Sequence, residues 1–497
     1  MKIRRIILND FRAFPGSVDY EFKLDGQNLL LFGENGSGKS SLFLGLREFF
    51  RPGIQGRPFK DFRHAFTQDA NGNDLTTGKV AIEFDDGAGV HSWDIVTDTR
   101  PRLVAQVAEA ALRFGAVDYR ETLRTNVFHE QGYPNLYKPL VEGVLSRLPV
   151  ISEGKQTTLG ALVERMTNSH PGRWGYHTAT VRKRIELALL NFNDAIANHL
   201  PAVVAEANRC LVGFGDLGMS FQLIAKKVTY NRPQRRFVDQ QIDLVCHLYG
   251  HDPKEPQSFL NEARLSALAL ALYFGSIRAS IPPEVPGAQA ARILVLDDVL
   301  MGMDLPNRLP VLRLLEQEFS DWQIILMTHD RAWFDLAREF TEHSKRWLYL
   351  RLLEMPTVTG QPSRPQIEAH QNLLDVAEKH LAVGDLMAAA VYVRASFETR
   401  VRNVCEKEGV EIPFKPNPKE VKVDKLWEGI VKRQQWRQDN GKPNFIEPQL
   451  MRDIETVRST ILNQLSHSGS PSLGTKDVRF ALDTMKTLEH HKFTKIT

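Results

Sequence analysis

The residues best suited to chemistry lie near the start of the chain, in the stretch GENGSGKSS at residues 33–41. An apolar run of strand length precedes this stretch at residues 28–32, and the apolar residues that follow it fit a buried helix. This order of strand, glycine-rich loop and helix matches the pattern G-x-x-x-x-G-K-[ST] of a phosphate-binding loop. The pattern is filled by Gly33, Gly38, Lys39 and Ser40.

Each residue type in this loop suits the binding of a nucleoside triphosphate. Glycines let the backbone fold around phosphate groups with its N–H groups pointing inward, and the start of the helix adds a favourable dipole. We expect the amine of Lys39 to reach the β- and γ-phosphates and the hydroxyl of Ser40 to bind Mg²⁺. A glycine- and serine-rich loop that matches by accident is the alternative, which the flanking strand and helix disfavour. The predicted nucleotide-binding residues are Gly33, Glu34, Asn35, Gly36, Ser37, Gly38, Lys39, Ser40 and Ser41.

Two later apolar runs of strand length also end in polar residues. The run at 293–296 is followed by Asp297 and Asp298, and the run at 323–327 is followed by Thr-His-Asp, with His329 in the middle. A carboxylate at the end of a strand beside a phosphate-binding loop is expected to hold Mg²⁺, which predicts this role for Asp297. Asp298 is then placed to accept a proton from an attacking water, unless the two carboxylates only cap the following turn. A histidine at the tip of a neighbouring parallel strand could touch the γ-phosphate, although a lone histidine is usually structural.

These motifs, in this order, resemble an ABC-type ATPase head of the SMC, RecF and OLD-like branch. The opening KIRRIILNDFRAF is also similar to that branch, where an N-terminal strand ends in an FR dipeptide, here Phe11 and Arg12. The resemblance covers roughly residues 1–350. It implies an α/β fold built as an ABC-type head, with ATP and Mg²⁺ as cofactors, and it adds Arg12 to the nucleotide-binding residues.

The resemblance also assigns roles to single residues. It implies that Asp297 is the Walker B aspartate, that Asp298 holds the catalytic acidic position and that His329 is the switch histidine. The stretch MGMD becomes the D-loop, which ends in Asp304. Gln131 is the candidate for the Q-loop glutamine that contacts the metal, and an ordinary loop residue is the alternative at this position.

Two positions depart from the family pattern. Most ABC heads have glutamate where this chain has Asp298, and the shorter side chain predicts slow hydrolysis with a long-lived ATP-bound state. The signature motif is degenerate, because SFLNE, with Ser258, Asn261 and Glu262, stands where an LSGGE-like stretch is usual. The buried helix predicted at 263–274 would direct its start at a partner's γ-phosphate, or Glu262 would simply suit the helix dipole. If the contact with a partner survives, two heads must meet with ATP between them, so we expect a homodimer or a higher homo-oligomer.

Composition limits the classes of protein that fit. The chain has 497 residues and a net charge of +3, so any nucleic-acid surface must be local. Cys210, Cys246 and Cys405 are far apart, which disfavours a disulfide framework or a thiolate zinc site and predicts a cytoplasmic location. The N-terminus does not read as a signal peptide, and no apolar stretch reaches the ~20 residues of a membrane span, so no membrane partner is expected.

Pattern changes along the chain predict an ATPase head, a linker and an all-α C-terminal domain. No heptad repeat is sustained between the two lobes of the head, so a short helical insertion is expected in place of a coiled coil. Strands are predicted at 79–84 and 92–96, and β-like patterns at 219–227 and 237–245. The predicted boundaries are 1–100 for the N-terminal lobe with the phosphate-binding loop, 101–215 for the helical insertion, 216–354 for the C-terminal lobe, 355–369 for the linker and 370–497 for a HEPN-like helical domain.

Two features of the C-terminal domain have alternative interpretations. Arg458, Asn463 and His467 are similar to residues of HEPN-like RNases, but the spacing is too long, so we expect a helix cap and no nuclease site. The stretch 415–442 mixes basic residues, tryptophans and acidic residues. It is more typical of a solvated helix face or a protein-docking surface than of a nucleic-acid site.

The resemblance extends to the ATPase subunits of the PARIS, Septu and retron-associated anti-phage systems, and to PARIS most of all. It implies a sensor that forms a homo-oligomer and restrains a partner nuclease toxin until a phage-encoded trigger protein appears. A RecF-like repair ATPase that binds DNA directly is the alternative, and DNA-stimulated hydrolysis would distinguish it. A third possibility is that the C-terminal domain is itself an RNase.

Overall fold

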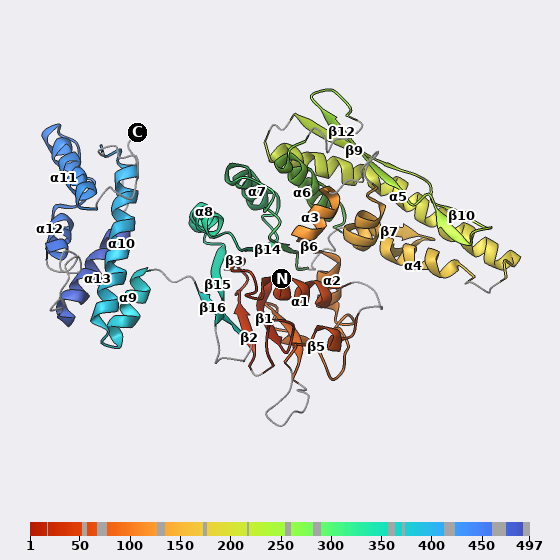
Figure 1. Ribbon diagram of the computed structural model, residues 1–497, viewed down its shortest axis with the longest axis horizontal. Helices are drawn as coiled ribbons and strands as arrows, with labels where there is room; N and C mark the ends of the chain where they lie inside the picture. Colours follow the sequence, from red (N-terminus) through yellow and green to blue (C-terminus); the bar gives the residue numbers. More distant parts are fainter. Residues whose placement is uncertain are drawn as a thin grey trace. The chain divides into compact units, whose positions relative to one another are not determined.

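The computed structural model describes residues 1–16, 18–51, 57–66, 77–126, 135–171, 176–215, 218–253, 260–281, 290–355, 363–369, 373–411, 423–459 and 474–490. The chain forms two compact units, Met1–Ala369 and His370–Thr497 (Figure 1). Each unit has its own buried apolar core.

A six-stranded sheet forms the centre of the first unit. Its strand order is β16 (Arg364–Ala369), β15 (Trp347–Met355), β3 (Asn28–Gly33), β14 (Gln323–Thr328), β13 (Ile293–Asp297) and β6 (Phe114–Asp118). All neighbouring pairs are parallel except β15 with β16. The strands β3, β13 and β14 are buried along their whole length, which explains why their sequences are nearly continuous apolar runs. The predicted α/β class is therefore confirmed.

A second, antiparallel sheet lies next to the first. Its order is β2 (Tyr20–Lys23), β1 (Ile3–Asn9), β4 (Lys79–Phe84) and β5 (Val90–Asp94). The helix α1 (Lys39–Phe49) shares one buried cluster with both sheets, and this packing fixes the helix that follows the glycine-rich loop. The strand predicted at 92–96 begins two residues earlier in the structure, at Val90.

Helices cover the other face of the central sheet (Figure 1). The longest, α5 (Ala179–Gly213), packs against α6 (Glu262–Ala279) so closely that a Cβ at Gly275 would lie 2.3 Å from the backbone nitrogen of Ala207. The remaining helices of this unit are α2 (Ala105–Leu112), α3 (Tyr119–Asn126), α4 (Leu159–Ser169), α7 (Leu305–Glu318) and α8 (Arg331–Thr341), with short turns η1 (Phe59–Phe62), η2 (Lys138–Gly143), η3 (Val144–Arg147) and η5 (Glu342–Ser344).

Three two-stranded sheets complete the first unit. They pair β7 (Pro149–Ser152) with β8 (Lys155–Thr158), β10 (Thr229–Asn231) with β11 (Arg236–Val238), and β9 (Met219–Ala225) with β12 (Ile242–Leu248). The β-like pattern at 219–227 thus pairs with the end of the pattern at 237–245 in a two-stranded sheet apart from the central one.

Two predicted segments differ from the structure. The insertion at 101–215 is not only helical, because β6 belongs to the central sheet beside β13. The predicted linker at 355–369 includes β16, which pairs with β15 at the edge of the same sheet. An edge strand tolerates proline, which explains how Pro365 fits here and why the segment looked like a linker.

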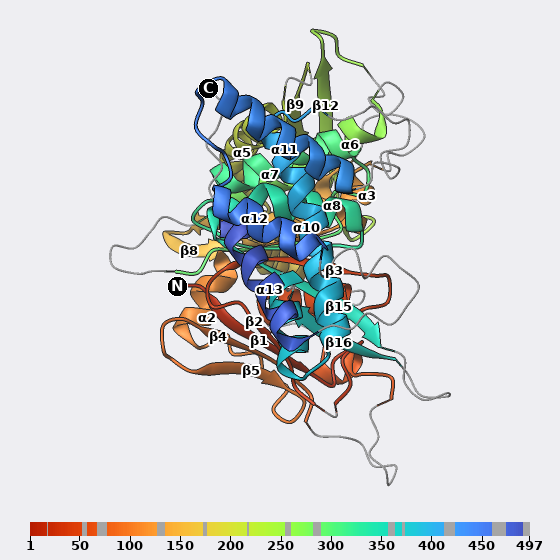
Figure 2. The same cartoon turned by 90° about the vertical axis from the view of Figure 1, so that its left-hand side faces the viewer.

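The second unit contains only helices within the described residues. They are α9 (Leu373–Ala382), α10 (Leu386–Lys407), α11 (Val423–Asp439), α12 (Pro448–Val457) and α13 (Thr475–His490), and Figures 1 and 2 show α13 lying along α10. Trp427 is buried and its indole N–H donates to Glu455, so this tryptophan supports the core. Asn463 and His467 lie outside the described residues, and Arg458 forms ion pairs with Asp424 and Glu455.

Candidate nucleotide-binding site

The glycine-rich loop leaves the carboxyl end of β3 and runs directly into α1. Gly38, the residue before the helix, has φ 111°, in the left-handed region that favours glycine. A Cβ at Gly33 would lie 2.4 Å from Ser37 Oγ and 2.9 Å from the carbonyl oxygen of Leu352. Both positions therefore need glycine for the loop to close in this shape.

The end of β13 meets the loop through one hydrogen bond between side chains. The hydroxyl of Ser40 donates to Asp297 Oδ2 at 2.7 Å, and the other carboxylate oxygen of Asp297, Oδ1, is buried without a hydrogen-bond partner in the described part of the chain. A hydroxyl beside a buried carboxylate with a spare oxygen suits Mg²⁺, which takes one or two carboxylates and completes its shell with water and phosphate oxygens. The residues present thus fit the predicted metal, although the described residues contain no group of three or more His, Cys, Asp or Glu side chains that could hold a metal ion.

Lys39 is the buried cation of the loop. Its amine donates to the carbonyl oxygens of Gly33 at 2.6 Å and Glu34 at 3.2 Å, and it lies 3.9 Å from Asp298 Oδ2. Burial lowers the pKa of Lys39, and the charges of Asp298 and Asp297 act in the opposite direction. The amine is thus a nearly water-free positive charge at the loop, which suits a phosphate group.

Asp298 and His329 are in contact because β13 and β14 are neighbours. Asp298 Oδ1 accepts from the backbone N–H of His329 and lies 2.9 Å from its Nδ1. Asp298 also has φ 53°, a left-handed conformation that asparagine and aspartate adopt more readily than other residues. A cavity of about 90 Å³ lies beside the pair, and Met301 and Arg308 are among the other residues that line it. This volume is large enough to hold a water molecule.

Burial makes Asp297 titrate in an unusual range. It raises the pKa of this carboxyl to about 6, helped by the charges of Asp298 and Asp118 and opposed by Ser40 and Lys39. Since an unfolded aspartate has a pKa of about 3.9, the folded chain binds this proton more tightly. The stability contributed by Asp297 is therefore present at low pH and is lost as the pH rises through about 6.

We expect Asp297→Asn to stabilise the nucleotide-free protein at neutral pH. The asparagine keeps an acceptor for Ser40 and removes the buried charge, so the melting temperature should rise by roughly 2–4 °C at pH 7.5 and by half as much or less at pH 4.5. Thermal denaturation at both pH values checks this, with Asp335→Asn, a half-exposed carboxylate on α8, as the control. An equal gain at the two pH values would contradict the account.

Two other predicted residues, Arg12 and Asp304, lie at the edges of this site, together with Arg308, which was not predicted from the sequence. Arg12 is exposed, has φ 50° and forms no ion pair with a described residue, while the next residue, Ala13, donates its N–H to Ser41 Oγ at 3.3 Å. Asp304 is exposed at the start of α7. Arg308 connects the loop after β13 with the loop after β14. It donates to the carbonyl oxygen of Met303 at 2.8 Å and to Asp330 Oδ2 at 2.6 Å.

The predicted signature and Q-loop residues are less fully described. Asn261 caps α6, since its side-chain oxygen accepts from the N–H of Arg264 at 2.9 Å, and Glu262 is the first residue of that helix. Glu262 lies in the first turn of α6, where its charge suits the helix dipole, as the structural alternative for this residue expects. Ser258 and Gln131 lie outside the described residues.

Sequence reasoning missed one acidic residue of the site. Asp118 ends β6 and pairs in register with Asp297, and its charge helps to raise the pKa of Asp297. Its Oδ1 accepts from the N–H of Glu121 at the start of α3. The signal was available, because FGAVD has the same form as ILVLD, a short run that ends in aspartate.

No protein-family model matches this chain, and no curated protein matches it. Among solved structures, an Smc head bound to the C-winged helix domain of ScpA is similar over 76% of this chain and 100% of its own length, at 11% identity and a TM-score of 0.42. A Pyrococcus furiosus Smc head with an extended coiled coil, bound to the C-terminal domain of ScpA, is similar over 76% and 99%, at 12% identity and a TM-score of 0.41. The SMC head from Thermotoga maritima is similar over 75% and 100%, at 15% identity and a TM-score of 0.35. Because these identities and TM-scores are low, the fold is assigned from the strand order and the loop geometry given above.

Proposed function

We propose that this chain binds and slowly hydrolyses ATP at the edge of the central sheet. The observation that carries the proposal is the meeting of three separate segments, in which Ser40 contacts Asp297 and the neighbouring Asp298 contacts His329. Lys39 and the loop backbone would hold the phosphates, and Ser40 and Asp297 would hold Mg²⁺. Bound Mg²⁺ would neutralise charge on the phosphate oxygens.

The hydrolytic step would use the contact between Asp298 and His329. Asp298 would take the proton of a water in the adjoining cavity, and His329 fixes the orientation of the carboxylate through its backbone N–H. Held in this way, the short aspartate side chain has little freedom to approach the water, which supports slow turnover.

We also propose that two heads associate around ATP. Asp304 and Met301 are exposed in the loop after β13, so the predicted D-loop is available to a second copy. Asn261, the N-cap of α6, and Glu262, its first residue, lie at the exposed start of this helix, where a partner's phosphate could be bound.

The biological role that we propose is control of a partner nuclease toxin in an anti-phage system, with a phage-encoded protein as trigger. This role comes from the resemblance of the motifs, and slow hydrolysis suits a latch that holds its partner for long periods. Of the helices in the described ranges, none is long and apolar enough to cross a membrane.

The test is to purify the Asp298→Asn chain with ATP and Mg²⁺ from cells that carry its native locus, and to weigh the intact complex. A nuclease that co-elutes in a fixed ratio is the expected result, and the Lys39→Ala chain purified in parallel is the control. Recovery of the homo-oligomer without any second protein would contradict the role of a gatekeeper.

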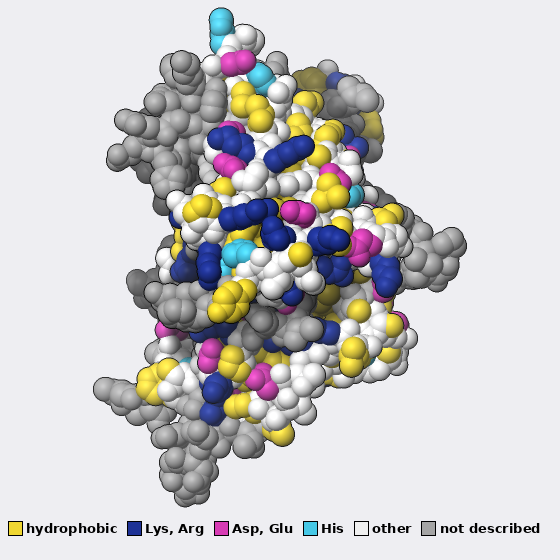
Figure 3. Space-filling view, turned by 90° about the vertical axis from the view of Figure 1, so that its right-hand side faces the viewer, with side chains coloured by type: hydrophobic (Ala, Val, Ile, Leu, Met, Phe, Trp, Pro, Cys, Tyr) yellow, Lys and Arg dark blue, Asp and Glu magenta, His cyan; other side chains and the backbone are white. Residues whose placement is uncertain are grey.

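One observation favours a second candidate function, direct action on DNA. The β10–β11 hairpin lies at the start of α5, where Tyr230 reaches His177 and Arg232 lies 3.9 Å from Glu186. Figure 3 shows Lys and Arg side chains gathering on this side of the molecule. The exposed basic residues of the hairpin and of the first turns of α5 are Arg182, Lys183, Arg184, Arg232, Arg235 and Arg236. DNA-stimulated ATP hydrolysis that weakens steeply with salt would support this function over that of a gatekeeper.

A further inference from the structure

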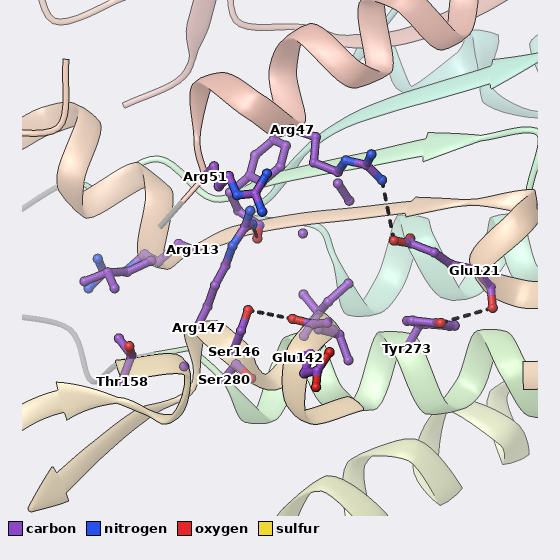
Figure 4. Close-up of a pocket in the computed structure, with 18 of the residues that line it drawn as sticks. Arg47, Arg51, Arg113, Glu121, Glu142, Ser146, Arg147, Thr158, Tyr273 and Ser280 are labelled. Carbon is purple, nitrogen blue, oxygen red and sulfur yellow. Dashed lines mark hydrogen bonds and ion pairs between the residues drawn. The ribbon is translucent and has the colours of Figure 1, made fainter. Parts of the chain in front are cut away.

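A second cavity lies away from the glycine-rich loop. It has a volume of about 850 Å³, within the range of small-molecule sites, and its lining includes no residue of 33–41 and neither Asp297 nor Asp298. It is lined mainly by the last turn of α1, the start of β6, the turns η2 and η3, and the helices α4 and α6 (Figure 4). All of these elements belong to the first unit.

Arg147 is the most unusual group in this cavity. No carboxylate among the described residues lies within ion-pair distance of its guanidinium, which donates to the carbonyl oxygen of Phe114 and lies 4.8 Å from the centre of that ring. Burial lowers the pKa of Arg147 to about 10. Even a partly buried cation is costly for a protein to keep without an anionic partner.

Other arginines increase this cost. Figure 4 shows the side chain of Arg147 reaching toward Arg51, with Arg47 nearby. The charges of Arg47 and Arg51 also lower the pKa of Arg147, although Glu121 and Glu48 oppose them. Each of those carboxylates has its own cation: Glu121 lies 3.6 Å from Arg47, and Glu48 pairs with Arg51 at 3.2 Å and Arg100 at 3.1 Å.

The remaining acidic residues of the lining do not neutralise this end of the cavity. Glu142 and Glu164 are exposed and form no ion pair with a described residue, so water solvates their charge. The apolar and aromatic part of the lining includes Leu112, Phe114 and Ile277. The cavity therefore combines a cationic end with a surface that could cover an organic group.

We propose that this cavity binds a small phosphate-bearing molecule, with its phosphate between Arg147 and Arg51. A guanidinium suits this ligand because its planar fork of N–H donors matches phosphate oxygens two at a time. The anion would supply the counter-charge that Arg147 lacks. The ligand would also contact the ends of α1 and α6, whose starts carry Lys39 and Asn261.

The test is a calorimetric titration of the full-length chain with inorganic pyrophosphate at low salt. The Lys39→Ala variant is the background, so that the glycine-rich loop does not contribute to binding. We expect saturable binding that Arg147→Met weakens at least tenfold and that Arg51→Met weakens at least fivefold. Arg402→Met, which removes the same charge from an exposed position on α10, should leave the affinity unchanged.

If Arg147→Met does not fold, Arg51→Met still tests the proposal. We expect Arg51→Met to fold, because Glu48 keeps its ion pair with Arg100 when Arg51 is replaced. The absence of saturable binding in the Lys39→Ala background would overturn the proposal, and so would equal weakening by Arg402→Met. Neither result depends on hydrolysis, so the outcome is separate from that of the proposed ATPase function.

Discussion

Replacing Lys39 with alanine is expected to weaken ATP binding by about 100-fold or more. The amine is buried at the loop and would be the main positive charge facing the β- and γ-phosphates. Removing one partner of a buried charge pair costs about 3–5 kcal/mol, which corresponds to a factor of at least ~100 in affinity. Titration with a fluorescent ATP analogue in the presence of Mg²⁺ measures the effect.

Two comparisons make the Lys39→Ala result interpretable. Lys60→Ala removes the same charge from an exposed position near the start of the chain and should leave the affinity unchanged. Because burial lowers the pKa of Lys39, losing the amine should not lower the melting temperature of the nucleotide-free protein. ATP affinity equal to that of the wild type would show that the glycine-rich loop is not the nucleotide site.

Asp298→Asn is expected to retain ATP binding and to lower the hydrolysis rate by about 10²–10⁴-fold, the range typical of a lost general base. Asparagine can still accept the hydrogen bond from the N–H of His329, and it tolerates the left-handed φ of 53° at this position. The backbone should therefore keep its shape while the proton acceptor is lost. Single-turnover hydrolysis of radiolabelled ATP measures the rate, and a filter-binding assay measures retention of the nucleotide.

The same variant should accumulate the ATP-bound dimer. If ATP joins two heads and hydrolysis separates them, Asp298→Asn with ATP should elute as a dimer at concentrations where the wild type does not. Asp335→Asn, on the outside of α8, should behave like the wild type in both assays. Hydrolysis by Asp298→Asn at the wild-type rate would mean that another group accepts the proton.

The central elements of the site could be predicted because their sequences carry strong local signals. The strands β3, β13 and β14 are buried on both faces, so each is a continuous apolar run, and the glycine pattern needs no tertiary information. The helix α6 was predicted for the same reason, since it is buried along most of its length. Its observed range extends beyond the predicted 263–274 to Ala279.

Other parts could not be predicted because they depend on distant contacts. The short run FGAVD does not indicate which strand it will pair with, and the place of β6 beside β13 in the folded sheet brings Asp118 to Asp297. The strand β16 contains Pro365 and forms by pairing at the edge of the sheet. The hydrogen bond of His329 to Asp298 likewise requires β13 and β14 to be neighbours.

The cavity around Arg147 shows the same limit. Its lining comes from segments between residues 47 and 322, and no local pattern marks them as one site. Only the packing of the folded unit reveals that Arg147 lacks a carboxylate partner among the described residues and lies near Arg47 and Arg51.

The most direct test of the central claim is the release of phosphate by the purified wild-type chain in ATP and Mg²⁺, measured beside Lys39→Ala and Asp298→Asn. We predict slow, steady release by the wild type and release below detection by both variants, with ATP still bound to Asp298→Asn and absent from Lys39→Ala. No release by the wild type, or release by Asp298→Asn at the same rate, would contradict the assignment of an ATPase site to this edge of the sheet.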